Sequence, residues 1–367
     1  MDAARVEPFF WQGKRVFLTG HTGFKGGWLA LWLVSMGAKV TGFALTPNTN
    51  PSFYAVSSIE NYLERSYIAN ITDPITLRQA LLDAKPDIVI HMAAQSLVRY
   101  GYKHPVETYA TNVMGTVNVL ENIRRVDTVR AVVIVTTDKC YENKEWHWGY
   151  RETEPMGGHD PYSSSKGCAE LVTNAYRTSF FSPLKYMDHG VGIATARAGN
   201  VIGGGDWAFD RLIPDALKAF QAQQVLKIRQ PLAVRPWQHV LEPLSGYLVL
   251  AQALFVNGTQ FGGAWNFGPR DEDARSVKEV INLVVNYWET TVRWEEICSE
   301  QPHEATLLKL DCSKARHHLK WFPRWTLEHS VKNIVQWHNE YARGSDMRDF
   351  SLRQIEEYQN FELNYLS

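Results

Sequence analysis

Short apolar runs recur along the first half of the chain, and stretches with helical periodicity separate them. Such a run is typical of a strand buried on both faces, whereas apolar residues spaced three and four apart are typical of a helix with one buried face. The strands expected from these runs cover residues 14–18, 39–45, 86–94, 131–135 and 191–197. Strands that alternate with helices predict an α/β fold with a doubly wound, parallel, Rossmann-type sheet, whose ligand lies at the carboxyl ends of the strands.

The helical stretches are longer, and the one at residues 106–125 carries an apolar stripe. The other expected helices begin near residue 27 and cover residues 76–84, 240–255, 277–288 and 327–341. The helix at 277 opens with a capping box made by Ser276 and Glu279. Residues 67–73 fit two interpretations: a short strand whose end reaches a ligand, or an edge strand followed by Asp73 as the cap of the next helix.

Gly20, Gly23 and Gly26 follow the first expected strand with the spacing of a dinucleotide-binding turn. Glycine permits the tight turn and lets backbone N–H groups approach a pyrophosphate at the N-terminus of the next helix. Strand, turn, helix and second strand are all in place, which favours a dinucleotide site over an ordinary strand–helix turn. Residues 44–48 offer neither an acid for the adenosine ribose nor an Arg for a 2′-phosphate, so this region leaves NAD and NADP open.

Four polar residues, two Thr, an Asp and a Lys, follow the central strand at residues 136–139. Further on, Tyr162 and Lys166 are four residues apart and would share one helix face. An ammonium beside a phenol favours the phenolate and lowers its pKa, which makes an acid/base that works near neutral pH. We therefore expect a hydroxyl, a carboxylic acid, a phenol and an ammonium at one strand end, in a site that moves protons.

The second half of the chain has a different pattern. Three glycines at residues 203–205 lie just past the last of these strands and suit close approach of the backbone to a ligand. Beyond them the alternation breaks, which predicts a smaller, loop-rich lobe. Arg211 and Arg235 lie there and could clamp phosphates, although a single arginine is more often a surface residue. We therefore expect a dinucleotide-binding domain at residues 1–198 and a mainly substrate-binding lobe at residues 199–367, with some of its chain returning to the first domain.

Composition argues against several classes of partner. The formal net charge is −1, with 21% charged and 45% apolar residues, so nothing favours a nucleic acid or a membrane. The cysteines are widely spaced, without a CxxC pair: Cys140, Cys168, Cys298 and Cys312. Free thiols and a polar N-terminus predict a cytoplasmic protein without a signal peptide. His317 and His318 lie near one cysteine, but no second ligand cluster has suitable spacing, so we expect no metal.

Several motifs occur in a fixed order: GHTGFKG, HMAAQS, TTDK, YSSSK and RAGNVIGGGDW. Together they resemble the extended short-chain dehydrogenase/reductase superfamily, and within it the nucleotide-sugar 4,6-dehydratases. Three further stretches resemble the members that act on CDP-glucose: FWQGKRVFLTGHTGFKGGWL, RPWQHVLEPL and LDCSKARHHLKW. This resemblance covers nearly the whole chain and implies a lyase of deoxysugar and O-antigen precursor biosynthesis, with NAD as cofactor and CDP-glucose as substrate.

The resemblance also implies binding residues. Those that would line the dinucleotide are Gly20, Gly23, Phe24, Lys25, Gly26, Asn70, Ile71, Ala93, Ala94, Thr111, Tyr162 and Lys166. Those that would hold the sugar nucleotide are Ser96, Asn200, Arg211 and Arg235. Asn70 stands where relatives often carry an Asp against the adenine. Together with the missing acid after the second strand, this implies loose NAD binding.

The catalytic residues implied by the resemblance are Thr137, Asp138, Lys139, Tyr162 and Lys166. Tyr162 would take the proton from the sugar C4 hydroxyl as hydride leaves C4, and Thr137 would hydrogen-bond the same hydroxyl. Lys166 would hold the nicotinamide ribose and lower the pKa of Tyr162. The 4-keto group would acidify C5–H, water would leave across C5–C6, and hydride would return to C6. Asp138 matches the acid that protonates the departing C6 hydroxyl.

Lys139 departs from the dTDP-glucose relatives, which carry a Glu at this position as the C5 base. A Lys can act as the base only if its pKa falls by several units; it could instead stabilise the enolate while another group takes the proton. The alternative functions are a GDP-mannose or dTDP-glucose dehydratase, a 4-epimerase, or a non-catalytic dinucleotide-binding protein. Asp138 weighs against an epimerase, and the intact Tyr162 and Lys166 weigh against a non-catalytic protein.

Two expected helices, at residues 106–125 and 162–180, match those that pair as a four-helix bundle in dimers of the family. The resemblance therefore implies a homodimer and leaves a tetramer open.

Overall fold

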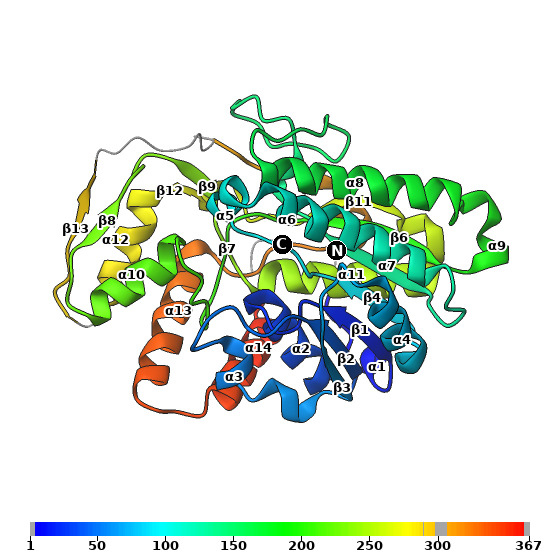
Figure 1. Cartoon of the computed structure of the whole chain (residues 1–367). Helices are drawn as coiled ribbons and strands as arrows, with labels where there is room; N and C mark the ends of the chain where they lie inside the picture. The colour runs from blue at the N-terminus through cyan, green and yellow to red at the C-terminus, as the bar shows by residue number, and fades with distance from the viewer. Residues whose placement is uncertain (1–3, 289, 298–306, 363–367) are drawn as a thin grey trace.

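A seven-stranded parallel sheet runs through the centre of the molecule, in the order β11-β6-β5-β4-β1-β2-β3 (Figure 1). The computed structural model describes residues 4–288, 290–297 and 307–362. The strands are β1 (Arg15–Thr19), β2 (Lys39–Ala44), β3 (Arg65–Ile68), β4 (Ile88–His91), β5 (Ala131–Val135), β6 (Gly192–Arg197) and β11 (Gly263–Asn266). The expected α/β fold with a doubly wound Rossmann-type sheet is confirmed.

Helices cover both faces of this sheet because its central strands are apolar on both sides. On β5, Val132 and Ile134 pack in one core cluster with residues of α4 (Pro74–Ala84) and α7 (Gly115–Ile123). Ala131 and Val133 face the other cluster, built on the other side of the sheet. The helices of that cluster are α2 (Phe24–Ser35), α11 (Leu241–Asn257) and α14 (Met347–Asn360). The sheet therefore separates two core clusters, one on each of its faces.

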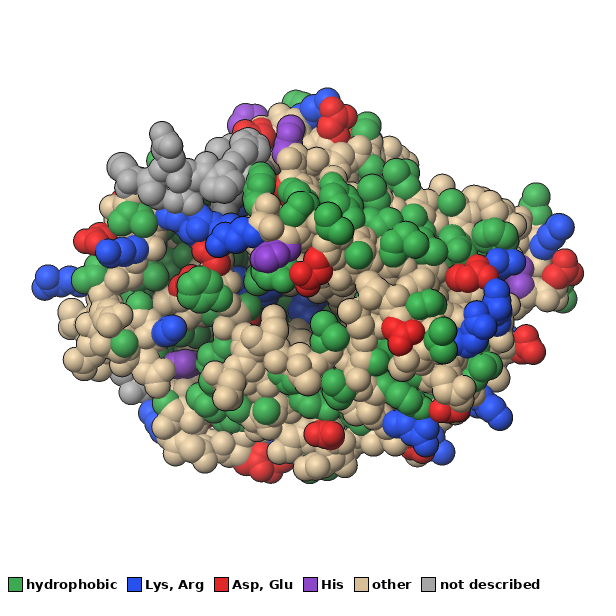
Figure 2. Space-filling view, viewed as in Figure 1, with side chains coloured by type: hydrophobic (Ala, Val, Ile, Leu, Met, Phe, Trp, Pro, Cys, Tyr) green, Lys and Arg blue, Asp and Glu red, His purple; other side chains and the backbone are tan. Residues whose placement is uncertain are grey.

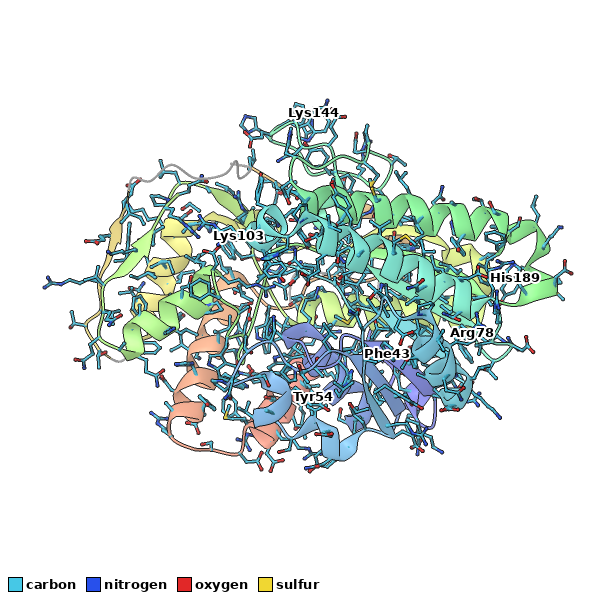
Figure 3. All side chains as sticks on the ribbon, in the orientation of Figure 1. Phe43, Tyr54, Arg78, Lys103, Lys144 and His189 are labelled. Carbon is cyan, nitrogen blue, oxygen red and sulfur yellow. The ribbon has the colours of Figure 1, made fainter. Side chains whose placement is uncertain are left out.

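Side chains fill the space between the sheet and its helices, as Figure 3 shows for the whole molecule. Phe43, labelled there on β2, is fully buried, and its ring centroid lies 6.0 Å from that of Phe17 on β1. The remaining short helices are α1 (Pro8–Trp11), α3 (Phe53–Val56), α5 (Val98–Lys103) and α9 (Tyr186–His189).

A smaller lobe lies at the left of Figure 1 and is formed by the second half of the chain. Its strands pair in twos: β7 (Val201–Ile202) with β10 (Gln238–His239), β9 (Val234–Pro236) with β12 (Ala274–Ser276), and β8 (Leu226–Ile228) with β13 (Trp294–Glu296). Its helices are α10 (Leu212–Gln221), α12 (Val277–Tyr287) and α13 (Leu327–Ala342). The lobe has a core cluster of its own. Because β11 and α11 pack with the main sheet, the chain beyond residue 198 contributes to both parts; the division at this residue stays a prediction.

One helix differs from its expected form. The stretch expected as a single helix at 106–125 consists of α6 (Pro105–Tyr109), a π-helical turn at Ala110–Met114, and α7. Within the turn, the Asn112 amide donates hydrogen bonds to the carbonyl of Gln95 and to Ser165 Oγ. The wider turn therefore places an amide that ties the loop after β4 to α8 (Pro161–Ser179).

Several boundaries also need correction. Helix α2 begins at Phe24, three residues before the expected start, because Gly23 already serves as its N-cap. Both interpretations of residues 67–73 agree with the structure: β3 is an edge strand that ends at Ile68 and the Asp73 carboxylate caps α4, and residues 69–71 line the cavity described below. The capping box of Ser276 at the start of α12 is confirmed. Strand β11 and helix α14 were not predicted.

The part of the chain that the structure describes contains no group of three or more His, Cys, Asp or Glu side chains that could hold a metal ion. Within the same ranges, no helix is both long and apolar enough to span a bilayer. Cys140, Cys168 and Cys312 are free thiols, and Cys298 lies outside the described residues.

A buried ion pair joins α8 to the end of β6. The guanidinium of Arg197 donates to both carboxylate oxygens of Glu170, at 2.9 and 2.7 Å, and the two side chains are 4% and 5% exposed. Glu170 also accepts hydrogen bonds from Thr136, just after β5, and from Thr195 in β6. One carboxylate thus fixes α8 against the carboxyl ends of two strands.

We predict that Glu170→Gln lowers the free energy of unfolding by about 3–5 kcal/mol, because it leaves the Arg197 guanidinium buried without its counter-charge. Urea denaturation followed by circular dichroism measures this loss. Thr178→Ala, at an exposed position on the same helix, is the control and should change stability by less than about 0.5 kcal/mol. An unfolding free energy within that range for Glu170→Gln would contradict the prediction.

Candidate active site

A cavity of about 680 Å³ lies at the carboxyl ends of the sheet strands, between the sheet and the smaller lobe. Figure 2 shows the hollow on the surface, with Lys and Arg side chains around and inside its mouth. Its walls come from the glycine turn after β1, from the ends of β2, β4 and β5, and from the loop that follows β6. This is the place that a doubly wound sheet offers to a ligand.

The turn at Gly20, Gly23 and Gly26 forms one end of the cavity. Gly20 has a φ of +79°, and a Cβ at Gly26 would lie 2.0 Å from the Gly20 carbonyl oxygen. The turn therefore accepts only glycine at both positions. Helix α2 starts at its end without a side-chain cap, so its first N–H groups remain available to an anion. This arrangement fits the pyrophosphate of a dinucleotide.

The phenol of Tyr162 lies in the first turn of α8, and that helix is capped by the Asp160 carboxylate. Tyr162 hydrogen-bonds Thr137, which follows β5. Burial raises the pKa of Tyr162 to about 12, although the bond to Thr137 and the charge of Arg211 lower it. The expected lowered pKa is therefore wrong for this cavity.

The position of Lys166 explains why the pKa of Tyr162 is not lowered. Its ammonium donates to the backbone carbonyl of Val135 at 3.2 Å, so it is held by the end of β5. The main influence on the pKa of Tyr162 is its burial. Burial lowers the pKa of Lys166 to about 8, while the negative charge of Glu170 opposes the shift. Lys166 lines the cavity beside Tyr162 without forming the phenol–ammonium pair that the spacing favours.

Asp138 lies behind the cavity wall. Its side chain is fully buried, and its Oδ1 accepts hydrogen bonds from Thr137 Oγ1 at 2.9 Å and from Lys139 Nζ at 3.3 Å. Its Oδ2 has no hydrogen-bond partner and lies where a Cβ on Gly199 would be 1.8 Å away. The structure therefore places Asp138 where it supports Thr137 and Lys139, and not at the cavity surface.

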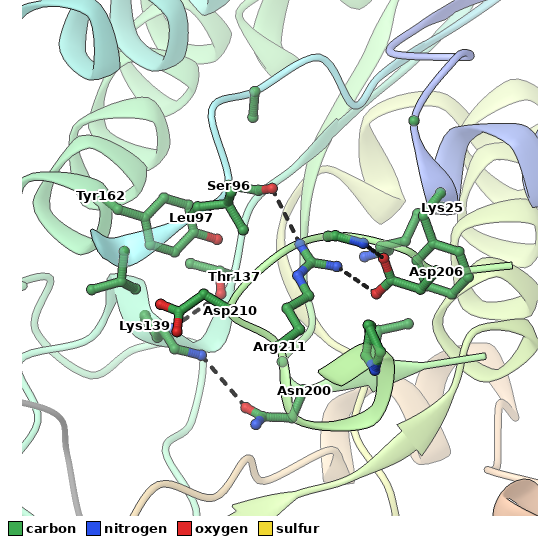
Figure 4. Close-up of a pocket in the computed structure, with 18 of the residues that line it drawn as sticks. Lys25, Ser96, Leu97, Thr137, Lys139, Tyr162, Asn200, Asp206, Asp210 and Arg211 are labelled. Carbon is green, nitrogen blue, oxygen red and sulfur yellow. Dashed lines mark hydrogen bonds and ion pairs between the residues drawn. The ribbon is translucent and has the colours of Figure 1, made fainter. Parts of the chain in front are cut away.

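Lys139 does line the cavity, with its side chain 30% exposed. Its Nζ lies 3.3 Å from Asp138 Oδ1 and 3.5 Å from Asn200 Oδ1. Figure 4 shows the contact with Asn200. The buried Asp138 carboxylate thus holds the Lys139 ammonium in a fixed position at the cavity wall. This geometry suits stabilisation of a developing negative charge better than removal of a proton.

Arg211 supplies a second fixed cation. Its Nη1 pairs with Asp206 Oδ2 at 3.0 Å and its Nη2 donates to Ser96 Oγ at 3.2 Å (Figure 4). The charge of Asp206 raises the pKa of Arg211. Arg235, on β9 of the smaller lobe, lines the same cavity. Two guanidinium groups from the second half of the chain therefore face one space, as phosphate recognition requires.

The structure brings the predicted site residues together. With the exception of Asp138, every residue predicted to bind cofactor or substrate or to act in catalysis lines this cavity. Sequence reasoning missed several charged residues of the wall: Arg99, Asp206, Asp210 and Arg229. Asp210 pairs with both Arg99, at 3.0 Å, and Arg229, at 2.8 Å. These side chains lie on loops or at the ends of elements, where no periodic pattern marks them.

Comparisons with known proteins agree with this arrangement. A family model described as GDP-mannose 4,6 dehydratase matches residues 17–334. A CDP-glucose 4,6-dehydratase from Salmonella typhimurium is 56% identical over 353 residues, which cover 96% of this chain and 98% of that protein. A dTDP-glucose 4,6-dehydratase from Xanthomonas campestris pv. campestris is 25% identical, over 88% of this chain and 92% of its own length.

Solved structures share the fold at lower identity. DesIV, a dTDP-glucose 4,6-dehydratase from Streptomyces venezuelae with NAD and TYD bound, has a TM-score of 0.76 at 21% identity, covering 90% of this chain and 98% of its own. A UDP-glucose 4-epimerase from Thermotoga maritima has a TM-score of 0.74 at 18% identity, covering 89% and 99%. The same architecture thus occurs in proteins with different reactions.

Proposed function

The chain belongs to the GDP-mannose 4,6-dehydratase family, and we propose that it converts CDP-glucose to CDP-4-dehydro-6-deoxyglucose and water. The observation that carries the proposal is the 56% identity with a CDP-glucose 4,6-dehydratase over nearly the full length of both chains. The dTDP-glucose dehydratase from Xanthomonas is only 25% identical, so it supports the alternative nucleotide less well. The unpaired cysteines Cys140, Cys168 and Cys312 are consistent with a reducing, cytoplasmic location.

NAD fits the glycine-lined end of the cavity, and when bound it would accept hydride from the sugar C4 and later return hydride to C6. Gly20, Gly23 and Gly26 would admit the pyrophosphate to the start of α2. Ile71 and Thr111 line the wall near that end. The nicotinamide ring would then lie in the part of the cavity that Tyr162 and Lys166 line.

In the first step Tyr162 takes the proton of the C4 hydroxyl, and Thr137 orients that hydroxyl through a hydrogen bond. The pKa of about 12 means that the phenol is protonated in the ligand-free cavity. The positive charges of Arg211 and of a bound oxidised nicotinamide would favour the phenolate that this step needs.

In the second step a basic group of the cavity takes the C5 proton, the C5–C6 double bond forms, and the C6 hydroxyl takes up a proton and leaves as water. Lys139, held by Asp138 and Asn200, would stabilise the negative charge on the keto oxygen or donate a proton to the departing hydroxyl. Asp138 then acts through Lys139, because its carboxylate does not reach the cavity. This replaces the direct acid role that the resemblance implies for Asp138.

The diphosphate of the substrate would lie between the strand ends of the sheet and the smaller lobe, which together form the cavity wall. Arg211 and Arg235 face this space, and Ser96 and Asn200 offer neutral hydrogen-bonding groups beside them. Arg211 is already fixed by Asp206, so little side-chain entropy remains to be lost when it binds a phosphate.

A substrate panel tests the function. Purified protein with added NAD is incubated with CDP-glucose, dTDP-glucose, UDP-glucose and GDP-mannose, and the alkali-developed absorbance of the 4-keto-6-deoxy product is followed. We expect product from CDP-glucose alone, without accumulation of reduced cofactor, and none from Tyr162→Phe. Product from another sugar nucleotide would contradict the proposed specificity for CDP-glucose. No product from any of the four would contradict the proposed dehydration reaction.

The role of Lys139 is tested by exchange of the C5 hydrogen with solvent. Lys139→Met should slow this exchange by roughly 10²–10³-fold, since it removes a charge that stabilises the enolate. Lys139→Arg keeps the charge but cannot serve as a base, and it should retain most of the exchange. If Lys139→Arg exchanges as slowly as Lys139→Met, Lys139 is the base itself.

We also propose a homodimer built through a four-helix bundle. Val106 on α6, Met114 at the π-helical turn and Leu171 on α8 are 82%, 52% and 59% exposed. Figure 2 shows hydrophobic side chains gathered over α6 and α8. An apolar surface on neighbouring helices supports pairing with a second copy of the chain. The family that the sequence resembles forms its dimers through the matching pair of helices.

Light scattering after gel filtration should give twice the chain mass for the wild type. Leu171→Asp should shift the protein to a monomer. Leu184→Asp, at a position 97% exposed outside this surface, is the matched control and should remain a dimer. A monomeric wild type would contradict the proposal, as would an unchanged mass for Leu171→Asp.

A further inference from the structure

The Asp210 carboxylate links two arginines that come from different parts of the fold. Its Oδ2 lies 3.0 Å from Nε of Arg99, in α5 just after β4. Its Oδ1 accepts a hydrogen bond at 2.8 Å from Nη2 of Arg229, directly after β8 in the smaller lobe. One carboxylate therefore joins the part built on the seven-stranded sheet to the smaller lobe. We call the side chains of Arg99, Asp210 and Arg229 the clasp.

The clasp lies at the outer rim of the cavity. Its three side chains line the cavity, and those of Arg99, Asp210 and Arg229 are 32%, 23% and 30% exposed. Tyr162 and Lys166, which line the same cavity, are buried. The clasp thus connects the two walls on the solvent side of the residues that are proposed to react.

The backbone of Asp210 is held in an uncommon conformation. Its φ is +64°, in the left-handed region that Asp and Asn adopt more readily than other non-glycine residues. The Asp215 carboxylate, in the first turn of α10, accepts a hydrogen bond from the backbone N–H of Asp210. The next residue, Arg211, donates to Ser96 Oγ in the loop after β4 at 3.2 Å (Figure 4). The loop is therefore fixed on both sides where Asp210 reaches both arginines.

The proposed reaction requires the sugar to stay in the cavity between two hydride transfers. The first transfer, together with loss of the C4 hydroxyl proton to Tyr162, leaves a 4-keto sugar beside a reduced cofactor. Hydride returns to the sugar only after water has left across C5–C6. A 4-keto sugar that dissociates earlier leaves one reduced cofactor behind for each molecule released, and that active site cannot begin another turnover.

We propose that the clasp closes the cavity over the bound sugar nucleotide and retains the 4-keto sugar until hydride has returned to C6, with Asp210 as its positioning residue. Two arginines share one carboxylate, so the clasp keeps a net positive charge that attracts the diphosphate of the ligand. Partly exposed ion pairs are individually weak, so the clasp opens for entry of substrate and exit of product. The inference rests on the proposed function.

The first test measures reduced cofactor left behind per molecule of product, with the full chain, NAD and CDP-glucose. Asp210→Asn keeps the size and the left-handed preference of the residue but removes its charge, and it should raise this ratio about three- to tenfold. Arg99→Met should act in the same way, and adding Asp210→Asn to it should have little further effect. High salt should raise the ratio of the wild type and leave that of Asp210→Asn unchanged.

Asp83→Asn is the matched control, because Asp83 pairs with Arg65 at 3.4 Å and does not line this cavity. It should keep the wild-type ratio. A merely structural role of Asp210 would lower product and reduced cofactor together, so an unchanged ratio in Asp210→Asn would overturn the inference. An equal rise of the ratio in Asp83→Asn would overturn it as well.

A second test needs no turnover. The dissociation rate of CDP is measured by stopped-flow tryptophan fluorescence, to which Trp207 and Trp237 of the cavity wall contribute. CDP should dissociate about three- to tenfold faster from Asp210→Asn than from the wild type, and equal rates would contradict the closure. If the wild type forms no product, the proposed reaction fails and this rate decides the inference. A wild type that neither binds CDP nor acts on CDP-glucose would overturn both.

Discussion

The buried ion pair between Glu170 and Arg197 is the interaction on which the position of the reactive side chains depends. Tyr162 and Lys166 precede Glu170 on the same helix, α8, so fixing that carboxylate fixes both. The same carboxylate accepts a hydrogen bond from Thr136, directly before Thr137, which lines the cavity. A pair at this depth contributes little net stability compared with apolar packing, but it defines one register of helix against strand ends.

The cavity holds its cations in two ways, and this difference organises the chemistry. Lys139 and Arg211 are each held by a buried carboxylate, which fixes the direction of both cations for binding oxyanions. Lys25 instead donates a hydrogen bond to the Tyr247 hydroxyl, and burial lowers its pKa to about 7. The first arrangement suits groups whose negative charge persists or develops, such as a diphosphate or an enolate.

The sheet was predictable because β1, β2, β4, β5 and β6 are apolar runs whose local pattern decides their structure. Strand β11 lacks such a run and helix α14 is largely polar. Packing against the rest of the fold therefore determines the structure of both segments, and the local sequence pattern does not. The parallel sheet made it predictable that the site residues lie together, because its strands end at one edge. The hydrogen bonds and burial of each side chain could not be predicted in this way.

Asp138 is turned away from the cavity into a gap that exists only because Gly199 lacks a Cβ. Lys25 and its partner Tyr247 are 222 residues apart, a distance at which no periodicity links them.

In the proposed reaction one cavity completes oxidation, elimination and hydride return within a single turnover. A crossover experiment tests this with CDP-glucose deuterated at C4, mixed with CDP-glucose labelled with ¹³C. We expect deuterium at C6 of the 4-keto product, only in molecules without ¹³C. Deuterium missing from C6, or scrambled into the ¹³C molecules, would contradict it.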